Sequence, residues 1–142
     1  MAAYALSGPV EFFGTAKVID GDTIIVNNQK VRLHGIDAPE LSQFCKHTIP
    51  CGIEAKEFLA SFVGKKAVKC KKITTDKYDR VVATCWHGSF DLGDQMVLNG
   101  YAMSDRPHPY LEHEAWARET NSGIWGQQPF ISPAAWRRIH KN

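Results

Sequence analysis

The order of elements along the chain predicts an α+β fold that is mainly β: a five-stranded OB-type barrel with about three helices. Three β-type runs come first, then a helical run, then two more β-type runs, and the remainder is helical. The β-type runs end at turn signals, and the helical runs carry apolar residues at helical spacing. An SH3-like barrel or another α+β fold fits this order nearly as well.

Size and composition indicate one soluble globular domain. The chain has 142 residues, of which 44% are hydrophobic and 23% charged, and this is enough to bury a core. We assign the domain to residues 10–142 and expect residues 1–9 to be a disordered or signal-remnant tail, because Ala3-Tyr4-Ala5 matches a signal-peptidase pattern. An arbitrary starting point explains these residues equally well. No run approaches the roughly 18 apolar residues of a membrane span.

The first three β-type runs cover residues 11–19, 23–26 and 30–36. The first ends at Asp20-Gly21-Asp22. The second is β-branched and stops at Asn27-Asn28, a pair typical of hairpin turns. The third alternates polar and apolar residues, so three of its side chains are expected to face the core: Val31, Leu33 and Ile36.

Helices are expected after a loop over residues 41–50. The first has apolar residues at helical spacing, namely Ala55, Phe58, Leu59, Phe62 and Val63. Gly64 is its candidate C-cap. A second helix is expected from Asp91, a good N-cap, to Gly100, and a third over residues 109–120. Ser132-Pro133 is suited to start one last short turn. Three aromatic residues of the tail are expected to cover the core rather than stack on bases: Trp125, Phe130 and Trp136.

Four cysteines allow three pairings, and the β-type runs over 67–70 and 81–86 narrow the choice. Cys70 and Cys85 lie symmetrically about the turn-like segment between those runs. A regular antiparallel hairpin therefore places them opposite each other, with Cα atoms ~4.5–5.5 Å apart. Cys45 and Cys51 are then left to close a short loop, and two local disulfides imply an oxidising compartment. A zinc site that includes His47, and reduced buried cysteines, are the open alternatives.

Positive charge is concentrated in one stretch, although the formal net charge is only +2. Six lysines fall within thirteen residues, with Arg80 just beyond them: Lys65, Lys66, Lys69, Lys71, Lys72 and Lys77. Such a cluster attracts phosphate, and it equally protects a solvated strand edge. The lysines by themselves favour neither interpretation.

Two short polar clusters interrupt strands that otherwise belong in a core: residues 20–23, and the segment from Arg32 to Glu40. Burying an unpaired charge is costly, so these groups need partners. A metal ion is one solution, since Asp22 and Asp37 offer the oxygen ligands that calcium prefers, on strands joined by a short turn. The alternative is that the first cluster is an ordinary turn and the second an ordinary strand end.

Cleavage of a phosphodiester bond needs residues of the types found in these clusters. Charge on the phosphoryl oxygens must be neutralised, the attacking water must lose a proton, the leaving oxygen must be stabilised, and all must be held in line. Arginine suits the first task because its fixed fork binds phosphate oxygens and stays ionised. A carboxylate suits the second. Arg32, Arg80 and Glu40 are available for these tasks.

The sequence resembles the staphylococcal nuclease, or thermonuclease, family over roughly residues 14–126. Three hallmarks of the family occur in order: Asp20 to Thr23, Arg32 to Glu40, and Asp76-Lys77-Tyr78-Asp79-Arg80. Gly123-Ile124-Trp125 also resembles the boundary of the family's last helix. One hallmark alone is weak, whereas three at near-family spacing are specific. The loop after Glu40, with its two cysteines, resembles the exported bacterial branch of the family, which has two disulfides.

The resemblance implies a staphylococcal-nuclease-like barrel with one metal site and three catalytic residues. The implied metal ligands are the carboxylates of Asp22 and Asp37 and the backbone carbonyl of Ala38. The implied catalytic residues are Arg32 on the scissile phosphate, Glu40 on the attacking water, and Arg80 on the transition state. The family metal is calcium, so one Ca²⁺ ion is expected rather than Mg²⁺ or Mn²⁺. The family also implies cleavage of DNA and RNA that leaves 3′-phosphate ends.

Two features depart from the family pattern. Ala38 stands where members often have threonine, so a hydroxyl contact is lost while the carbonyl ligand is kept. The nucleotide-stacking tyrosines of the family are not clearly matched, because residues 103–110 have a different sequence. We predict four substrate-binding residues: Lys77, Tyr78, Arg106 and Tyr110. His108 is a further candidate phosphate contact, and Tyr110 has packing against the next helix as a second interpretation.

These features together predict a secreted or periplasmic bacterial endonuclease that is calcium-dependent and monomeric. We expect it to prefer single-stranded DNA and RNA, since unpaired strands reach a shallow barrel site more easily. Two other functions stay open: a catalytically inactive nucleic-acid-binding module, and an oligosaccharide-binding or envelope-associated protein. Neither explains why the two arginines coexist with Asp37 and Glu40.

Overall fold

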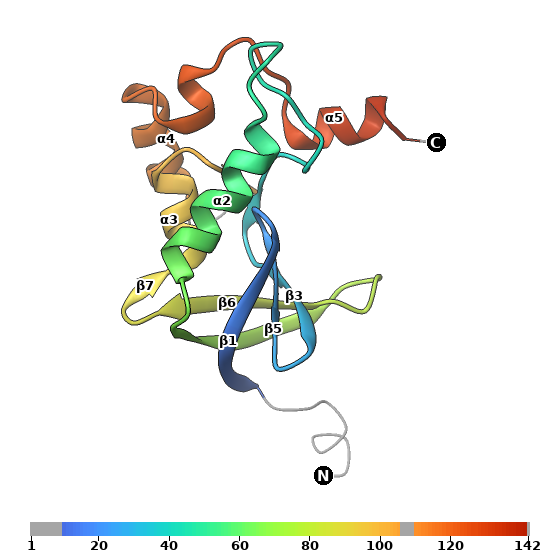
Figure 1. The fold of residues 1–142 in the computed structure, drawn as a ribbon, viewed down its shortest axis with the longest axis vertical. Coiled ribbons are helices and arrows are strands. Elements are labelled where there is room, and N and C mark those ends of the chain that lie inside the picture. The colour runs from blue at the N-terminus through green and yellow to red at the C-terminus, as the bar shows by residue number, and fades with distance from the viewer. Residues whose placement is uncertain (1–9, 106–109, 142) are drawn as a thin grey trace.

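Five strands close into a barrel in the computed structural model, which describes residues 10–105 and 110–141 (Figure 1). These strands are β1 (Glu11–Asp20), β2 (Thr23–Val26), β3 (Gln29–Leu33), β5 (Ala67–Thr75) and β6 (Val81–His87). Antiparallel pairs link them in the order β3-β2-β1-β5-β6, and parallel pairing of β3 with β6 closes the barrel. The predicted OB-type barrel is thereby confirmed. The expected tail over residues 1–9 lies outside the described residues.

The third predicted strand is divided into two. β3 ends at Leu33, and the two-residue strand β4 (Ile36–Asp37) pairs with β8 (Met103–Ser104). Gly35 lies between them with φ of 81°, which glycine adopts without steric cost, so the chain turns there. As a result, Asp37 leaves the barrel sheet while Arg32 stays in it. A further short strand, β7 (Phe90–Asp91), extends the sheet beyond β6.

Four α-helices lie within the described part of the chain: α2 (Cys51–Val63), α3 (Leu92–Leu98), α4 (Leu111–Glu119) and α5 (Pro133–Ile139). A 3-10 helix covers Gly123–Gly126. The predicted caps are present, since Asp91 accepts from the Asp94 N–H at 3.1 Å and Ser132 from the Ala135 N–H at 3.1 Å. In Figure 1, α3 and α4 lie on one side of α2 and α5 lies on the other. Across these residues, no helix is long and apolar enough to cross a bilayer.

The hydrophobic core fills the barrel and continues beneath α2 and α3. Val31, Leu33 and Ile36 are fully buried there, as predicted. A second, smaller cluster forms around Trp125, against which Phe130 packs edge-on with ring centroids 5.3 Å apart. The prediction for Trp136 is wrong. Its ring stacks on that of His140, with ring centroids 3.9 Å apart, instead of covering the core.

Both predicted disulfides are present, Cys45–Cys51 and Cys70–Cys85. No free cysteine exists in the described chain, so the zinc site and the reduced state are excluded here. Cys70 pairs with Cys85 in the β5–β6 register, with Cα atoms 4.0 Å apart, somewhat closer than predicted. The register shifts by one residue between Lys72 and Thr74, which lie between the cysteines and the turn. Without this bulge the register at the turn would place Cys70 opposite Trp86, so the bulge is what brings the two cysteines together. Two such disulfides suggest an oxidising, extracellular or periplasmic environment.

Tyr110 joins α4 to α3 through a partly buried hydrogen bond. Its phenol donates to the two carboxylate oxygens of Asp91 at 2.8 and 3.0 Å, and its side chain packs against Gly93. Burial, with the nearby charge of Asp91, raises the pKa of Tyr110 above its ordinary value. The protonated phenol is therefore the form that stabilises the fold.

We expect Tyr110→Phe to lower the free energy of unfolding by about 1–3 kcal/mol, because the Asp91 carboxylate loses its buried partner. The contribution of Tyr110 to the free energy of unfolding is complete at pH values below 10.0, its ordinary pKa. Above that pH the contribution declines, because the unfolded chain releases the phenol proton while the folded chain keeps it. Denaturant unfolding from pH 7 to 11 measures both effects, with exposed Tyr78→Phe as the control. Equal stability of Tyr110→Phe and Tyr78→Phe would contradict this role.

Candidate active site

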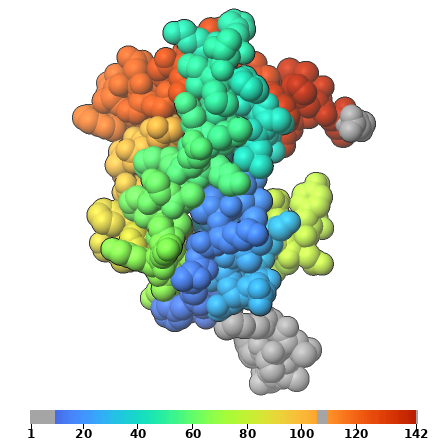
Figure 2. Space-filling model, in the orientation of Figure 1, coloured from blue at the N-terminus to red at the C-terminus, as the bar shows by residue number. Residues whose placement is uncertain are grey.

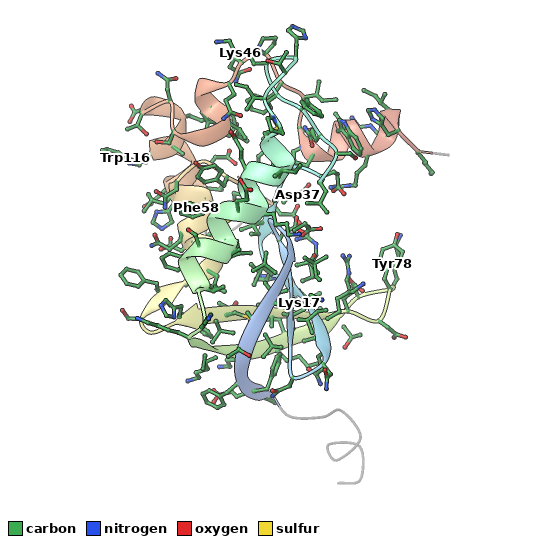
Figure 3. The ribbon with its side chains drawn as sticks, in the orientation of Figure 1. Lys17, Asp37, Lys46, Phe58, Tyr78 and Trp116 are labelled. Carbon is green, nitrogen blue, oxygen red and sulfur yellow. A yellow bond between two sulfur atoms is a disulfide. The ribbon has the colours of Figure 1, made fainter. Side chains whose placement is uncertain are left out.

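A cleft of about 530 Å³ opens between the β5–β6 turn, the β1–β2 turn and α5. Figure 2 shows the surface hollowed between the yellow-green turn and the red helix, and Figure 3 shows Asp37 and Tyr78 on that side of the molecule. Among the described residues, eight line the cleft: Asp20, Asp22, Lys30, Arg32, Glu40, Tyr78, Arg80 and Arg137. Segments far apart in the sequence therefore meet here, and all three predicted catalytic residues are among them.

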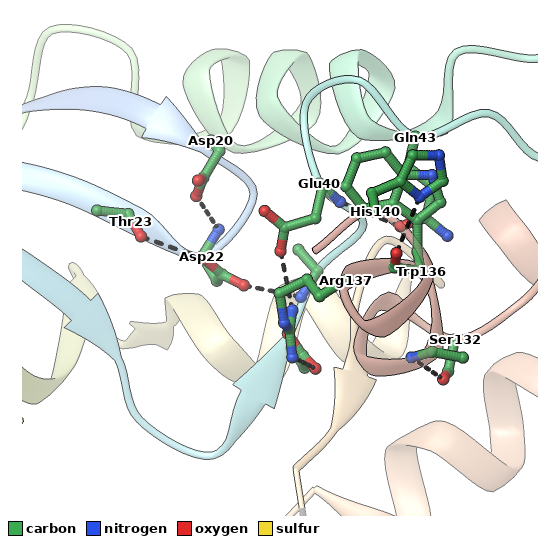
Figure 4. A network of polar contacts seen from close by, with 12 residues as sticks. Asp20, Asp22, Thr23, Glu40, Gln43, Ser132, Trp136, Arg137 and His140 are labelled. Atoms are coloured by element: carbon green, nitrogen blue, oxygen red, sulfur yellow. Dashed lines mark hydrogen bonds and ion pairs between the residues drawn. The ribbon is translucent and has the colours of Figure 1, made fainter. Parts of the chain in front are cut away.

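Asp22 is fixed in the turn between β1 and β2. One carboxylate oxygen accepts the Ala38 N–H at 2.9 Å, and the other accepts the Thr23 hydroxyl at 3.2 Å. The Asp22 N–H donates to Asp20 at 3.1 Å (Figure 4). A Cβ at Gly21 would meet the Cβ of Ala38 at 2.6 Å, so the close turn requires glycine. Burial raises the pKa of Asp22 to about 7, and the nearby charge of Arg32 opposes that rise.

Arg32 lies between the two predicted metal ligands. Its guanidinium is 3.2 Å from Asp22 Oδ2 and 3.5 Å from Asp37 Oδ1. The β2–β3 hairpin sets this arrangement, because Thr23 pairs with Arg32 and places the preceding residue, Asp22, beside the arginine. Two carboxylates and one arginine are thus held together at one end of the barrel.

The donor set fits a hard divalent cation. Asp22 and Asp37 offer carboxylate oxygens around a shared guanidinium, and Ala38 adds a backbone carbonyl next to Asp37. The desolvated carboxylate of Asp22 is a group whose charge such a cation would compensate. Residues 10–105 and 110–141 contain no cluster of three or more histidine, cysteine or acidic residues able to hold a metal. The remaining ligands would therefore be the Ala38 carbonyl and water.

Glu40 belongs to a loop that is pinned on both sides. The Glu40 N–H donates to the Gln43 side chain at 3.2 Å, and Gln43 donates in turn to the Ile131 carbonyl at 2.9 Å. A Cβ at Gly52 would collide with the Glu40 carbonyl, so the first turn of α2 packs directly on this loop. Gln43 is 1% exposed, and nothing in the sequence pattern marked it or Gly52 as supports of the site.

The Cys45–Cys51 disulfide closes the same loop onto the start of α2. From within the loop, the Lys46 N–H donates to the Pro129 carbonyl at 2.9 Å. The disulfide therefore holds the loop that follows Glu40, and the Lys46 hydrogen bond links this loop to the chain that leads into α5.

Arg80 is positioned by Asp76 across the β5–β6 turn. Asp76 accepts the Arg80 Nε–H at 2.8 Å and the backbone N–H groups of Tyr78 and Arg80 at 2.8 and 3.0 Å. Burial alone would raise the pKa of Asp76, but these hydrogen bonds lower it below the ordinary value. Among the described residues, no hydrogen bond engages the terminal amino groups of Arg80, so they are available to a ligand in the cleft.

The predicted substrate-binding residues have different locations. Tyr78 is exposed on the cleft wall, with the Lys77 ammonium 5.3 Å and the Arg80 guanidinium 5.4 Å from its ring centre. Tyr110 is buried against α3 and does not line the cleft, so a structural role replaces the predicted substrate contact. Arg106 and His108 lie outside the described residues.

Arg137 is the one cleft residue of α5, and sequence reasoning did not predict it. Its amino groups lie 3.0 Å from each oxygen of Asp37 and 2.8 Å from Glu40 Oε2. Figure 4 shows its side chain pointing from α5 toward Glu40. Hydrogen bonds to Asp37 and Glu40 raise the pKa of Arg137 further above its ordinary value. The partners are 97 and 100 residues away in sequence, so no local pattern could have indicated the contact.

Comparison with known proteins supports the resemblance. A family model described as "Staphylococcal nuclease homologue" matches residues 30–127. The chain is 33% identical over 125 residues to "Probable endonuclease LCL3" of Komagataella phaffii, covering 78% of this chain and 55% of that protein. It is 31% identical over 134 residues to "Uncharacterized endonuclease" of Haemophilus influenzae, covering 88% and 72%.

A third relative carries a different kind of name. "Succinoglycan biosynthesis protein ExoI" of Rhizobium meliloti is 32% identical over 131 residues, covering 86% of this chain and 69% of that protein. The chain therefore spans about half the length of the Komagataella relative and more than two thirds of the other two.

Proposed function

The chain belongs to the staphylococcal nuclease family, and from that premise we propose that it is a metal-dependent endonuclease. One observation carries the proposal: Arg32 lies between Asp22 and Asp37, and Glu40 and Arg80 line the same cleft. Acidic ligands, a carboxylate for water and two arginines for phosphate thus share one solvent-open site. The proposed cation is calcium, because all the available ligands are oxygens and the hydrogen bond from the Ala38 N–H to Asp22 fixes two of them.

In the proposed reaction, water attacks phosphorus, and the bond from phosphorus to the 5′ oxygen breaks. The leaving 5′ oxygen takes up a proton from solvent, so the products are a 3′-phosphate and a 5′-hydroxyl. Glu40 orients the water and accepts its proton. Arg32 and Arg80 neutralise the charge that builds on the phosphoryl oxygens, and Arg80 also faces the leaving oxygen. A cation held by Asp22, Asp37 and the Ala38 carbonyl would supply further positive charge at the phosphate when bound.

We propose DNA and RNA as substrates, with single strands preferred. Tyr78, flanked by two cations, offers an exposed ring on one wall of the cleft. Beside the cleft, a second groove of about 450 Å³ is lined by rings that include Phe44, Trp136 and His140. Aromatic faces next to a cationic site suit unpaired bases, since every base can stack on them. A duplex keeps its bases stacked inside and cannot use these faces.

A second candidate function is a role alongside extracellular polysaccharide synthesis, which the name of the Rhizobium relative favours. A glycosidic bond has no phosphoryl oxygens that require Arg32, Arg80 and a cation together, so the nuclease explains more of the site. We further propose that the protein acts as a monomer outside the bacterial cytoplasm, where its two disulfides are stable.

Digestion of defined substrates tests the proposed function. Purified protein is incubated with single-stranded DNA, duplex plasmid and RNA, in calcium, in magnesium, and in chelator. We expect cleavage in calcium, loss of cleavage in chelator, and faster cleavage of the unpaired substrates, with 3′-phosphate ends on the products. Activity in magnesium but not in calcium would overturn the choice of metal. No cleavage of any of these substrates would overturn the nuclease.

A further inference from the structure

Arg137 forms ion pairs with two carboxylates that the proposed mechanism needs, those of Asp37 and Glu40. It forms a two-pronged ion pair with both oxygens of Asp37, at 3.0 Å each, and a third contact with Glu40 at 2.8 Å. Asp37 is also 3.5 Å from Arg32, so two guanidinium groups share one carboxylate. The proposed metal ligand and the proposed water-activating residue are therefore both held by a side chain from α5.

The position of Arg137 follows from how α5 is attached. Ser132 caps the helix, and Pro133 occupies its first turn. Just before the helix, the Ile131 carbonyl accepts a hydrogen bond from Gln43, the buried residue that also accepts from the Glu40 N–H. The loop that carries Glu40 and the helix that carries Arg137 thus form one connected unit. The position of the ion pair therefore follows from the way this unit is held together.

The charges at the site would allow a divalent cation to replace Arg137 on Asp37. The carboxyl groups of Asp22, Asp37 and Glu40 meet the positive charges of Arg32 and Arg137 at the same place. A divalent cation on Asp37 would compete with Arg137 for the same oxygens and repel its guanidinium at short range. Arg137 is 44% exposed along its side chain, so it can leave the site without unpacking the core.

We propose that Arg137 is an internal substitute for the metal ion, holding Asp37 and Glu40 when the cation is absent and giving way to it when the cation binds. The proposal rests on the proposed function, in that Asp37 is taken to be a metal ligand. Departure of Arg137 frees Glu40 at the same moment, so cation binding and release of the water-activating carboxylate are one event. The contact thereby sets the calcium concentration at which the site becomes competent.

Calcium binding measured by titration calorimetry tests this exchange. The variants are Arg137→Gln, which removes the competing charge, Arg137→Lys, which keeps charge but loses the fork, and Arg138→Gln. Arg138 is the next residue on α5 and is exposed, so it controls for a general change of net charge. We expect Arg137→Gln to bind calcium on the order of tenfold more tightly than wild type, a typical coupling between competing ligands. Arg137→Lys should be intermediate, and Arg138→Gln should match wild type.

Thermal unfolding supplies a second readout that does not depend on catalysis. In chelator, Arg137→Gln should unfold at a lower temperature than wild type, because Asp37 and Glu40 lose their ion pairs with Arg137. In saturating calcium that difference should shrink, since the cation takes over the same carboxylate. Circular dichroism at low temperature checks that each variant is folded.

The outcomes separate this proposal from the proposed function. If wild type binds calcium and cleaves nucleic acid, but Arg137→Gln binds no more tightly than Arg138→Gln, the exchange is wrong and the nuclease stands. If neither wild type nor Arg137→Gln binds calcium, the metal site is wrong and the exchange falls with it. A difference in unfolding temperature that is the same in chelator and in calcium also overturns the exchange.

Discussion

Replacement of Arg80 with alanine is expected to lower kcat by about 10³–10⁵-fold, the range lost with an arginine that stabilises the charge of phosphoryl transfer. Asp76 holds Nε of Arg80 at 2.8 Å, which leaves its terminal amino groups facing the cleft. Arg80→Lys should recover only part of the activity, because an ammonium lacks the fork that binds two phosphate oxygens. Single-turnover cleavage of a labelled oligonucleotide in saturating calcium measures both variants.

Arg138→Ala is the matched control for Arg80→Ala, since it removes an exposed arginine of α5. Calcium affinity should be nearly unchanged in Arg80→Ala, because Arg80 does not contact Asp22 or Asp37 in the described structure. Equal turnover by Arg80→Ala and Arg138→Ala would remove Arg80 from the mechanism.

Glu40→Gln is expected to lower kcat by about 10²–10⁴-fold, the usual contribution of general acid–base catalysis. Glutamine keeps the shape of the side chain and can still accept from Arg137, so the loop held by Gln43 and Gly52 should be unaffected. The amide cannot accept a proton from the attacking water. Rates measured at saturating substrate and calcium isolate this step from binding.

Glu57→Gln makes the same chemical change on the exposed face of α2 and should have wild-type turnover. If Glu40→Gln turned over as fast as Glu57→Gln, the water would have to be activated by another group. A loss confined to KM, with kcat retained, would likewise assign Glu40 to substrate binding and contradict the proposed role.

Local patterns predicted the parts of the site that are joined by short connections. The Asn27-Asn28 turn sets the β2–β3 register, and this register brings Asp22 beside Arg32. The symmetric spacing of Cys70 and Cys85 predicted their pairing, and the one-residue bulge between Lys72 and Thr74 gives the hairpin the register that this pairing needs. In such hairpins the distance along the chain determines the distance in space.

Contacts between remote segments could not be predicted in this way. Arg137 lies on a seven-residue helix, and its ion pairs depend on how that helix docks against the Glu40 loop. The docking in turn depends on Gln43, a loop residue whose burial follows from tertiary packing alone. Tyr110 had two interpretations from its place in the sequence, a substrate contact and packing against the helix. Its burial and its hydrogen bond to Asp91 favour packing, and the position of Asp91 in space could not be predicted from the sequence.

The central claim is that the side chains of this cleft converge on one cation and one phosphate. A crystal structure with calcium and a dinucleotide that has a non-hydrolysable phosphonate link tests it most directly. We predict anomalous scattering from calcium between Asp22 and Asp37, with the phosphonate bound by Arg32 and Arg80. Calcium bound elsewhere, or a phosphonate out of reach of both arginines, would contradict the account.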